Sequence, residues 1–263
     1  MAAAVIRLDG VSKIYASRDG EPIEALKNIT VQIADGEFIT IVGPSGCGKS
    51  TLLKMIVGLL PVSSGEITFD GVVVDRPRVD VGMVFQEPVL LPWRHIREIV
   101  LLPVEILRRR DRDYAREADR LLQLVGLAGF ERKMPHELSG GMQQRVAICR
   151  ALIHDPGVLV MDEPFGALDA MTREEMGAEL LRIWQARRKT VLFVTHSIRE
   201  AVWLADRVVV MTPRPGAVAD VIDVALPRPR TTRMQFLPEF GRHVEEIGEL
   251  IARKRGDTLL CQD

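Results

Sequence analysis

The segment Gly43-Pro44-Ser45-Gly46-Cys47-Gly48-Lys49-Ser50-Thr51 constrains the fold of this 263-residue chain more than any other. It follows an apolar run at 37–42 that is typical of a strand, and the pattern of residues 51–60 predicts a helix directly after it. Its glycines let backbone amides surround the β-phosphate of a nucleotide, and the helix N-terminus adds its dipole. Lys49 is expected to reach the β- and γ-phosphates and Ser50 to bind Mg²⁺. The segment therefore predicts a strand–loop–helix unit that holds a nucleotide.

Strand and helix patterns alternate along the rest of the chain, which favours a parallel sheet covered on both faces. Residues 96–125 and 141–153 have a helical pattern and lie between two predicted sheet strands, so we interpret about 88–155 as an inserted helical subdomain. Beyond Pro227 the composition changes, and residues 238–253 predict one amphipathic helix. The predicted strands are 5–8, 29–33, 37–42, 66–69, 72–74, 81–85, 158–161, 190–194 and 207–211, and the other predicted helices are 172–187 and 198–205. Asp70-Gly71, between the strands at 66–69 and 72–74, predicts a two-residue hairpin turn.

Composition limits the functional classes. The net charge of −1 provides no overall field toward nucleic acid, and no apolar run approaches the roughly 18 residues that a bilayer span requires. Cys47, Cys149 and Cys261 show no metal-binding spacing and indicate a reducing compartment. We therefore expect a soluble chain without a signal segment, bound to a membrane only through a partner.

A second chemical motif follows the apolar run at 158–161. Asp162 lies where this buried strand would meet the phosphates and is expected to hold Mg²⁺ through a water. Glu163 points elsewhere, because strand side chains alternate, and it is placed to orient or deprotonate the attacking water. Alone, the pair is equally compatible with a plain strand end; beside the phosphate loop, the functional interpretation is favoured.

A third motif, Ser139-Gly140-Gly141, opens the predicted helix at 141–153. Taken alone it is a turn in which Ser139 caps the helix. The order of all three motifs, however, resembles the nucleotide-binding subunit of ATP-binding-cassette transporters over roughly residues 5–225. Leu138 to Arg145 is similar to the signature segment of that family, with Met142 where glutamine is commonest.

The resemblance implies an α/β fold with a phosphate-loop NTPase core, a parallel sheet, an N-terminal antiparallel β subdomain and the inserted helical subdomain. The cassette would occupy residues 1–226, and residues 227–263 would form a C-terminal extension. The residues of the implied ATP site, in chain order, are Tyr15, the loop at 43–51, Gln86, Ser139, Gly140, Gly141, Gln143, Asp162, Glu163, Asp169 and His196.

The resemblance also assigns roles within this set. Tyr15 would stack on adenine, although a core strand residue is the plain alternative. Gln86 would contact Mg²⁺ and the attacking water, and His196 would contact the γ-phosphate. Asp169 belongs to a loop that crosses to the opposite subunit, with Gly166 where serine is frequent. The implied catalytic residues are thus Glu163, Gln86 and His196. The implied metal ligands are Ser50, Gln86 and Asp162.

The family mechanism needs two subunits. They meet head to tail, so that Ser139, Gly140 and Gly141 of one subunit cover the γ-phosphate held by Lys49 of the other. The expected ligands are ATP and Mg²⁺. The expected partners are a second copy or a paralogous ATPase, transmembrane permease subunits and, indirectly, a substrate-binding protein, with no nucleic acid. The expected location is the cytoplasmic face of the inner membrane.

Residues 86–94 suggest where a permease would dock, because Leu90 and Leu91 lie between Pro88 and Pro92, and Trp93 follows directly. Local core packing is the alternative. This segment, residues 211–216 and the proline-arginine tail resemble importers of nitrate, sulfonate, taurine and bicarbonate. A soluble cassette ATPase acting on ribosomes or DNA and a generic phosphate-loop switch or kinase are the alternative functions. Because Cys47 lies within the phosphate loop, alkylation of its thiol is expected to block ATP binding, with Cys149 reacting more slowly.

Overall fold

The computed structural model describes residues 4–16, 20–166 and 168–255, and the chain divides into two compact units. Unit 1 comprises Met1–Arg78 and Gln185–Asp263, and unit 2 comprises Val79–Trp184. Cys261 lies outside the described residues. None of the helices in the described ranges is both long enough and apolar enough to cross a bilayer.

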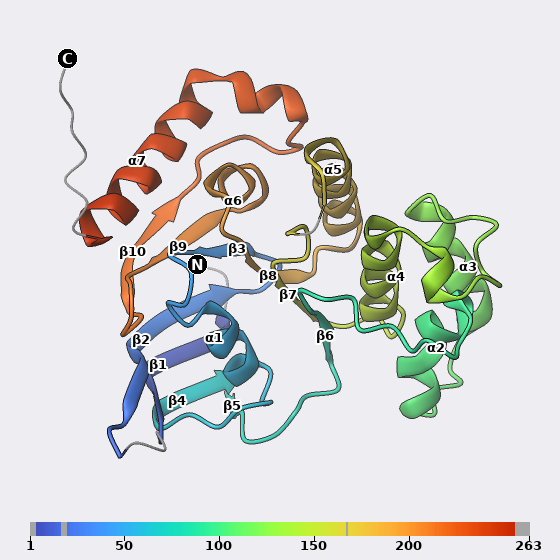
Figure 1. Cartoon of the computed structure of the whole chain (residues 1–263), viewed down its shortest axis with the longest axis horizontal. Helices are drawn as coiled ribbons and strands as arrows, with labels where there is room; N and C mark the ends of the chain where they lie inside the picture. The colour runs from blue at the N-terminus through green and yellow to red at the C-terminus, as the bar shows by residue number, and fades with distance from the viewer. Residues whose placement is uncertain (1–3, 17–19, 167, 256–263) are drawn as a thin grey trace. The chain divides into compact units, whose positions relative to one another are not determined.

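Unit 1 contains an antiparallel sheet of order β2-β1-β4-β5 (Figure 1). The first two strands of this sheet, β1 and β2, extend beyond the apolar runs at 5–8 and 29–33, because their pairing continues through several register shifts. Asp70 and Gly71 both have positive φ, 52° and 76°, as the predicted two-residue hairpin turn requires. The strands are β1 (Ala4–Tyr15), β2 (Ile23–Ala34), β4 (Ser64–Phe69) and β5 (Val72–Val73).

Unit 1 also contains strands of order β10-β9-β3-β8, in which β3 is parallel to both neighbours and β10 is antiparallel to β9. Every residue of β3 and β8 is buried. Helices α6 and α7 pack against each other and against β9 (Figure 1). The bounds are β3 (Phe38–Val42), β8 (Thr190–Val194), β9 (Arg207–Met211), β10 (Val218–Asp223), α1 (Lys49–Ile56), α6 (Ile198–Leu204), α7 (Pro238–Arg255) and the 3₁₀ turn η2 (Thr232–Phe236).

Unit 2 pairs β6 with β7 in parallel and packs α2, α3 and α4 together. The single helical stretch predicted at 96–125 is wrong: it is two helices. Arg108 has a φ of 52° just after the first helix, and the Asp113 side chain accepts a hydrogen bond from the Arg116 amide at 3.0 Å to start the second. The bounds are β6 (Val81–Val84), β7 (Val158–Asp162), α2 (Ile96–Ile106), α3 (Tyr114–Leu124), α4 (Gly140–Leu152), the 3₁₀ turn η1 (Pro135–Glu137) and α5 (Ala170–Arg187), which continues past the unit boundary.

Candidate functional site

The phosphate loop of unit 1 has the turned backbone that an anion site needs. Gly46 and Gly48 have φ values of 74° and 102°, and helix α1 begins at Lys49 directly after them. The Lys49 ammonium is 6% exposed and donates to the carbonyls of Gly43 and Pro44 at 3.0 and 3.2 Å. The cation is thus held at the mouth of the loop, where a phosphate would meet both the charge and the helix N-terminus.

The glycine at position 48 is required by space as well as by conformation. A Cβ there would lie 2.7 Å from Leu26 Cδ2 and 3.3 Å from the Ala25 carbonyl oxygen. No such obstacle lies within 4 Å of a Cβ at Gly46. Gly48 therefore lets the loop pack closely on β2, whereas Gly46 is required for its positive φ alone.

The expectation that alkylation of Cys47 blocks ATP binding requires an accessible thiol, and the structure contradicts this premise. Cys47 is only 1% exposed, and its Sγ lies 3.1 Å from where a Cβ of Gly43 would be. The side chain is turned under the loop, so Cys47 faces the protein interior. Its backbone remains part of the loop.

Tyr15 and His196 also belong to unit 1. Tyr15 ends β1, is 37% exposed, and its hydroxyl lies 3.5 Å from Thr51 Oγ1 on the first turn of α1. This places the ring beside the phosphate loop and rules out the core alternative. The Lys13 ammonium lies 5.3 Å from the ring centroid.

His196 follows β8 at the same sheet edge as the phosphate loop follows β3. The register pairs Ile41 with Val194, and the Thr195 amide donates to the Ile41 carbonyl at 3.2 Å. His196 itself is exposed, between Thr195 and the helix cap Ser197. Unit 1 thus brings together the phosphate loop, Tyr15 and His196.

Unit 2 brings together Gln86, Asp162 and Glu163. The register of β6 and β7 pairs Val84 with Met161, so Gln86 and Glu163 each lie two residues beyond this pair, at one sheet edge. Asp162 is 6% exposed, Gln86 is exposed, and Glu163 is half-buried with a φ of 44°. A non-glycine residue in this left-handed region turns the backbone sharply at the strand end.

The signature segment is, in the single chain, a capped helix start. Ser139 is the N-cap of α4, and its Oγ accepts from the Met142 amide at 3.3 Å. Ser139 and Gly140 are exposed, and a Cβ at Gly140 would have nothing within 4 Å. Gln143 donates its side-chain amide to the carbonyls of Pro135 and Leu138 at 2.9 and 3.3 Å, which holds η1 against α4. The open surface at Gly140 leaves room for a ligand to approach the amides of this helix start.

Asp169 caps α5 in the same manner. Its carboxylate accepts from the Thr172 amide at 3.0 Å and from the Thr172 hydroxyl at 2.6 Å. These hydrogen bonds, above all that from the hydroxyl, lower the pKa of Asp169.

Two residues on α4 escaped the sequence-based prediction. Gln144 is 3% exposed and donates to the Phe85 carbonyl at 3.3 Å, just before Gln86. Arg150 donates to the carbonyls of Val89 and Pro88 at 2.7 and 2.9 Å, just after Gln86. Both contacts end on backbone carbonyls, which carry no residue-specific signal in a sequence. The helix that begins with the signature therefore holds the chain on both sides of Gln86.

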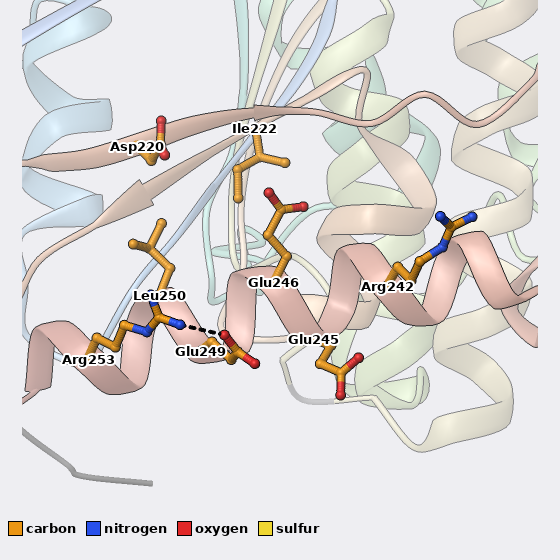
Figure 2. A pocket seen from close by; sticks show the side chains of 8 residues that line it. All are labelled: Asp220, Ile222, Arg242, Glu245, Glu246, Glu249, Leu250 and Arg253. Atoms are coloured by element: carbon orange, nitrogen blue, oxygen red, sulfur yellow. Dashed lines mark hydrogen bonds and ion pairs between the residues drawn. The ribbon is translucent and has the colours of Figure 1, made fainter. Parts of the chain in front are cut away.

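Figure 2 shows a groove of about 410 Å³ between β10 and α7 in unit 1. Carboxylates dominate its lining, which disfavours a phosphate ligand. Arg253 in this groove is already paired with Glu249 at 2.8 Å. The lining residues are Asp220, Ile222, Arg242, Glu245, Glu246, Glu249, Leu250 and Arg253. The residues predicted to bind ATP lie elsewhere in the chain.

The chain also matches a known protein family. The family model described as ABC transporter matches residues 26–166. The chain belongs to the ATP-binding-cassette transporter family. It is therefore a cassette ATPase that binds adenine nucleotide, and the predicted fold class is confirmed.

Relatives and a solved structure support this assignment over most of the chain. The taurine import ATP-binding protein TauB of Rhizobium johnstonii is 46% identical, with 94% of this chain and 96% of that protein covered. The aliphatic sulfonates import ATP-binding protein SsuB of Bacillus cereus is 44% identical, with 91% and 94% covered. The dimeric post-hydrolysis structure of the cassette MJ0796 bound to ADP and Pi has a TM-score of 0.75 at 34% identity, covering 84% of this chain and 100% of that one.

Proposed function

We propose that the chain is the ATP-hydrolysing subunit of a membrane importer and dimerises head to tail around two ATP molecules. One observation carries the proposal: Ser139 and Gly140 present an exposed, unobstructed helix start in a chain that has a single phosphate loop. A helix start of this kind is suited to a phosphate held by another copy. The MJ0796 cassette in its ADP- and Pi-bound state is described as dimeric, which supports the same arrangement.

In the proposed reaction the residues divide into binding and chemical roles. The loop at 43–51 and Lys49 hold the β- and γ-phosphates, and Tyr15 stacks on adenine. Glu163 orients or deprotonates the attacking water, and His196 contacts the γ-phosphate. Charge that develops on the phosphoryl oxygens is stabilised by Lys49 and the α1 dipole in an in-line displacement.

The donor set fits Mg²⁺. Ser50, Gln86 and Asp162 offer oxygen ligands, and Mg²⁺ sites that also use substrate phosphates need only one or two carboxylates. When bound, Mg²⁺ would neutralise phosphate charge; Ser50, Gln86 and Asp162 would hold it. In the opposing subunit, Ser139, Gly140, Gly141 and Gln143 would cover the γ-phosphate, with Asp169 in the crossing loop.

We further propose that a permease docks on unit 2 beside residues 86–94. Trp93 is 70% exposed and Val89 61% exposed. The Arg150 guanidinium donates a hydrogen bond to the Val89 carbonyl. Arg150 also lines an apolar groove of about 280 Å³ together with Val79 and Ile106. Exposed apolar side chains beside a groove are typical of a protein-binding surface.

We propose that the imported substrate is nitrate, sulfonate, taurine, bicarbonate or a related small solute; two relatives are named for the import of aliphatic sulfonates and of taurine, which supports the sulfonate and taurine part of this group. The chain would then lie on the cytoplasmic face of the inner membrane, with a substrate-binding protein as an indirect partner. We propose residues 1–226 as the cassette domain, about 88–155 as its helical subdomain and 227–263 as the extension.

ATP hydrolysis and permease capture test the two parts of the proposal separately. The purified chain should release phosphate from ATP only with Mg²⁺, and Glu163→Gln and Lys49→Met should each lower kcat by at least about 100-fold. A tagged chain should co-purify a polytopic membrane protein, and Trp93→Ala should weaken that capture without changing ATPase activity. Capture of ribosomes or DNA in its place would contradict the importer assignment.

A further inference from the structure

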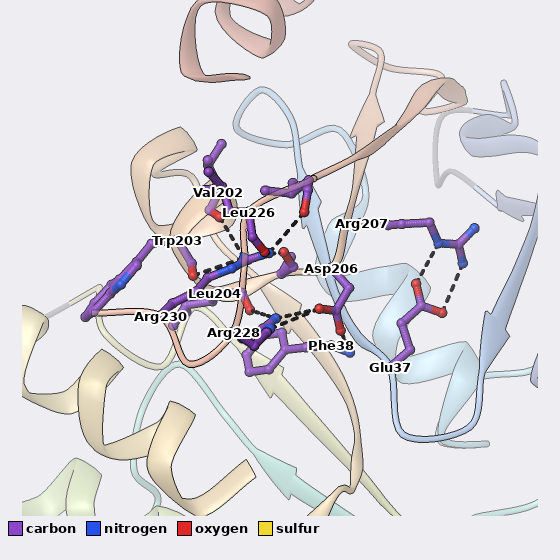
Figure 3. Close-up of polar contacts among 12 residues, drawn as sticks. Glu37, Phe38, Val202, Trp203, Leu204, Asp206, Arg207, Leu226, Arg228 and Arg230 are labelled. Atoms are coloured by element: carbon purple, nitrogen blue, oxygen red, sulfur yellow. Dashed lines mark hydrogen bonds and ion pairs between the residues drawn. The ribbon is translucent and has the colours of Figure 1, made fainter. Parts of the chain in front are cut away.

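Residues 224–240 follow β10 and are called the tail. Arg230 of the tail lies at the C-terminal end of α6, the helix that follows His196. Arg230 is 5% exposed, and its guanidinium donates to the carbonyls of Val202 and Trp203 at 3.0 and 3.2 Å and also to that of Ala205 (Figure 3). It reaches the tail's own carbonyls of Val224 and Leu226 as well. All five of these hydrogen bonds from Arg230 are accepted by backbone oxygens.

Arg228 completes the same contact. Its guanidinium donates to the Leu204 carbonyl at 2.7 Å and to Asp206 Oδ1 at 2.7 Å. The carbonyls of residues 202–205 are the four that lack partners at the end of an α-helix, and a cation there also complements the helix dipole. Two tail arginines thus satisfy the whole C-terminal end of α6 (Figure 3).

The tail also holds α6 near its start. The Arg199 guanidinium donates to the Gln235 carbonyl at 3.2 Å and lies 5.1 Å from the centroid of the Phe240 ring, which is fully buried. Arg199 is three residues beyond His196. The tail therefore contacts α6 near both of its ends.

A helix this short depends on such contacts. Seven residues span only about 10 Å, and isolated helices below about 12 residues are marginal in water. At its start, the Glu200 amide donates to Ser197 Oγ at 3.3 Å and the Thr195 hydroxyl donates to Glu200 Oε2 at 2.6 Å. These bonds tie the residues on both sides of His196 to the first turn of α6, so we expect a displacement of α6 to displace His196 as well.

We propose that tail residues 228–240 act as a clamp on α6 that positions His196 for contact with the γ-phosphate. Arg230 and Arg228 hold the C-terminal end of the helix, and Gln235 and Phe240 hold its first turn through Arg199. These are positioning residues, because they would act on hydrolysis through His196. The inference rests on the proposed role of His196 in ATP hydrolysis.

The test compares variants of the full-length chain in ATP hydrolysis. Arg230→Gln should lower kcat by about 10-fold and leave KM for ATP within about 2-fold, because binding rests on the phosphate loop while His196 is displaced. Arg230→Lys keeps the charge and should recover part of kcat. Arg199→Gln changes an exposed side chain and should lower kcat less than Arg230→Gln. It is the test variant if Arg230→Gln does not fold. Arg242→Gln, an exposed arginine of α7, is the matched control and should leave both constants unchanged.

Hydrogen–deuterium exchange provides a readout that needs no hydrolysis. The amides of residues 195–200 should exchange faster in Arg230→Gln and in Arg199→Gln, although Arg230 does not contact them. The clamp is overturned if both variants keep kcat within about 2-fold of the native chain, or if kcat falls while exchange at 195–200 stays unchanged. If His196→Ala hydrolyses ATP normally, the proposed role of His196 fails instead, and exchange at 195–200 still reports whether the clamp exists.

Discussion

The contact between Arg150 and the segment after Gln86 predicts a measurable loss of stability in Arg150→Met. This change removes the two hydrogen bonds to Val89 and Pro88 and keeps an apolar stem of similar length. At about 1.5 kcal/mol for each hydrogen bond from a charged donor, the gross loss is about 3 kcal/mol. Val89 has a φ of 44°, and a β-branched residue in that region costs about 1–2 kcal/mol, which is recovered when the loop relaxes. The net fall in the free energy of unfolding should therefore be about 1–2 kcal/mol.

A second variant isolates the strain at Val89. Val89→Gly removes the left-handed penalty, loses little burial because Val89 is 61% exposed, and adds about 0.5–1 kcal/mol of backbone entropy cost. It should be neutral or slightly stabilising. In that background no strain remains to be released, so Arg150→Met should cost about 3 kcal/mol, more than it costs in the native chain.

Urea unfolding followed by tryptophan fluorescence gives the four free energies of this cycle. An equal cost of Arg150→Met in both backgrounds would refute the reasoning. So would a destabilisation of more than about 1 kcal/mol by Val89→Gly, since glycine is favoured wherever φ is positive.

Further expectations concern packing, thiol reactivity and pH. Gly82→Ala should lower the free energy of unfolding by about 1–3 kcal/mol, because its Cβ would overlap the Ala151 carbonyl, whereas Gly157→Ala, with open space, should be nearly neutral in the same urea assay. Brief iodoacetamide treatment of the native chain should leave Cys47 and Cys149 unmodified, as measured by mass spectrometry, because both thiols are buried. Burial also raises the pKa of Cys149, which slows its reaction further. Rapid modification of Cys47 would contradict its buried position. Burial lowers the pKa of His154 in the folded chain. The contribution of neutral His154 to the free energy of unfolding should therefore be fully present above its unfolded-state pKa of about 6.5 and be lost as pH falls through its folded-state pKa. His154→Gln should flatten the pH dependence of the free energy of unfolding between about pH 7 and 5.

The sequence predicted those parts of the fold that depend on local pattern. The strand at 190–194, the hairpin at Asp70-Gly71 and the amphipathic helix of the tail are present, and Phe240 and Ile247 of that helix are fully buried. The pattern did not separate α2 from α3, because charged residues continue across the break. It also missed β10, an edge strand whose pairing with β9 depends on tertiary contact rather than on periodicity.

The sequence predicted the parts of the site that belong to recognisable motifs. The phosphate loop, His196 and the strand end at Asp162 follow from spacing and from the family resemblance. The orientation of Cys47 could not be predicted, since the spacing of glycines does not say which way a loop side chain turns. Nor could the roles of Gln144, Arg150 and Arg230, whose partners are main-chain carbonyls distant in sequence.

The most direct test of the central claim, that two copies share each ATP site, is the mass in solution of Glu163→Gln by light scattering. Without nucleotide it should match one chain of 29.4 kDa, and at saturating Mg-ATP it should double. Adding Ser139→Arg should keep it monomeric while ATP still binds to the phosphate loop. A mass of one chain for Glu163→Gln at saturating ATP, alone and with its permease, would contradict the shared site.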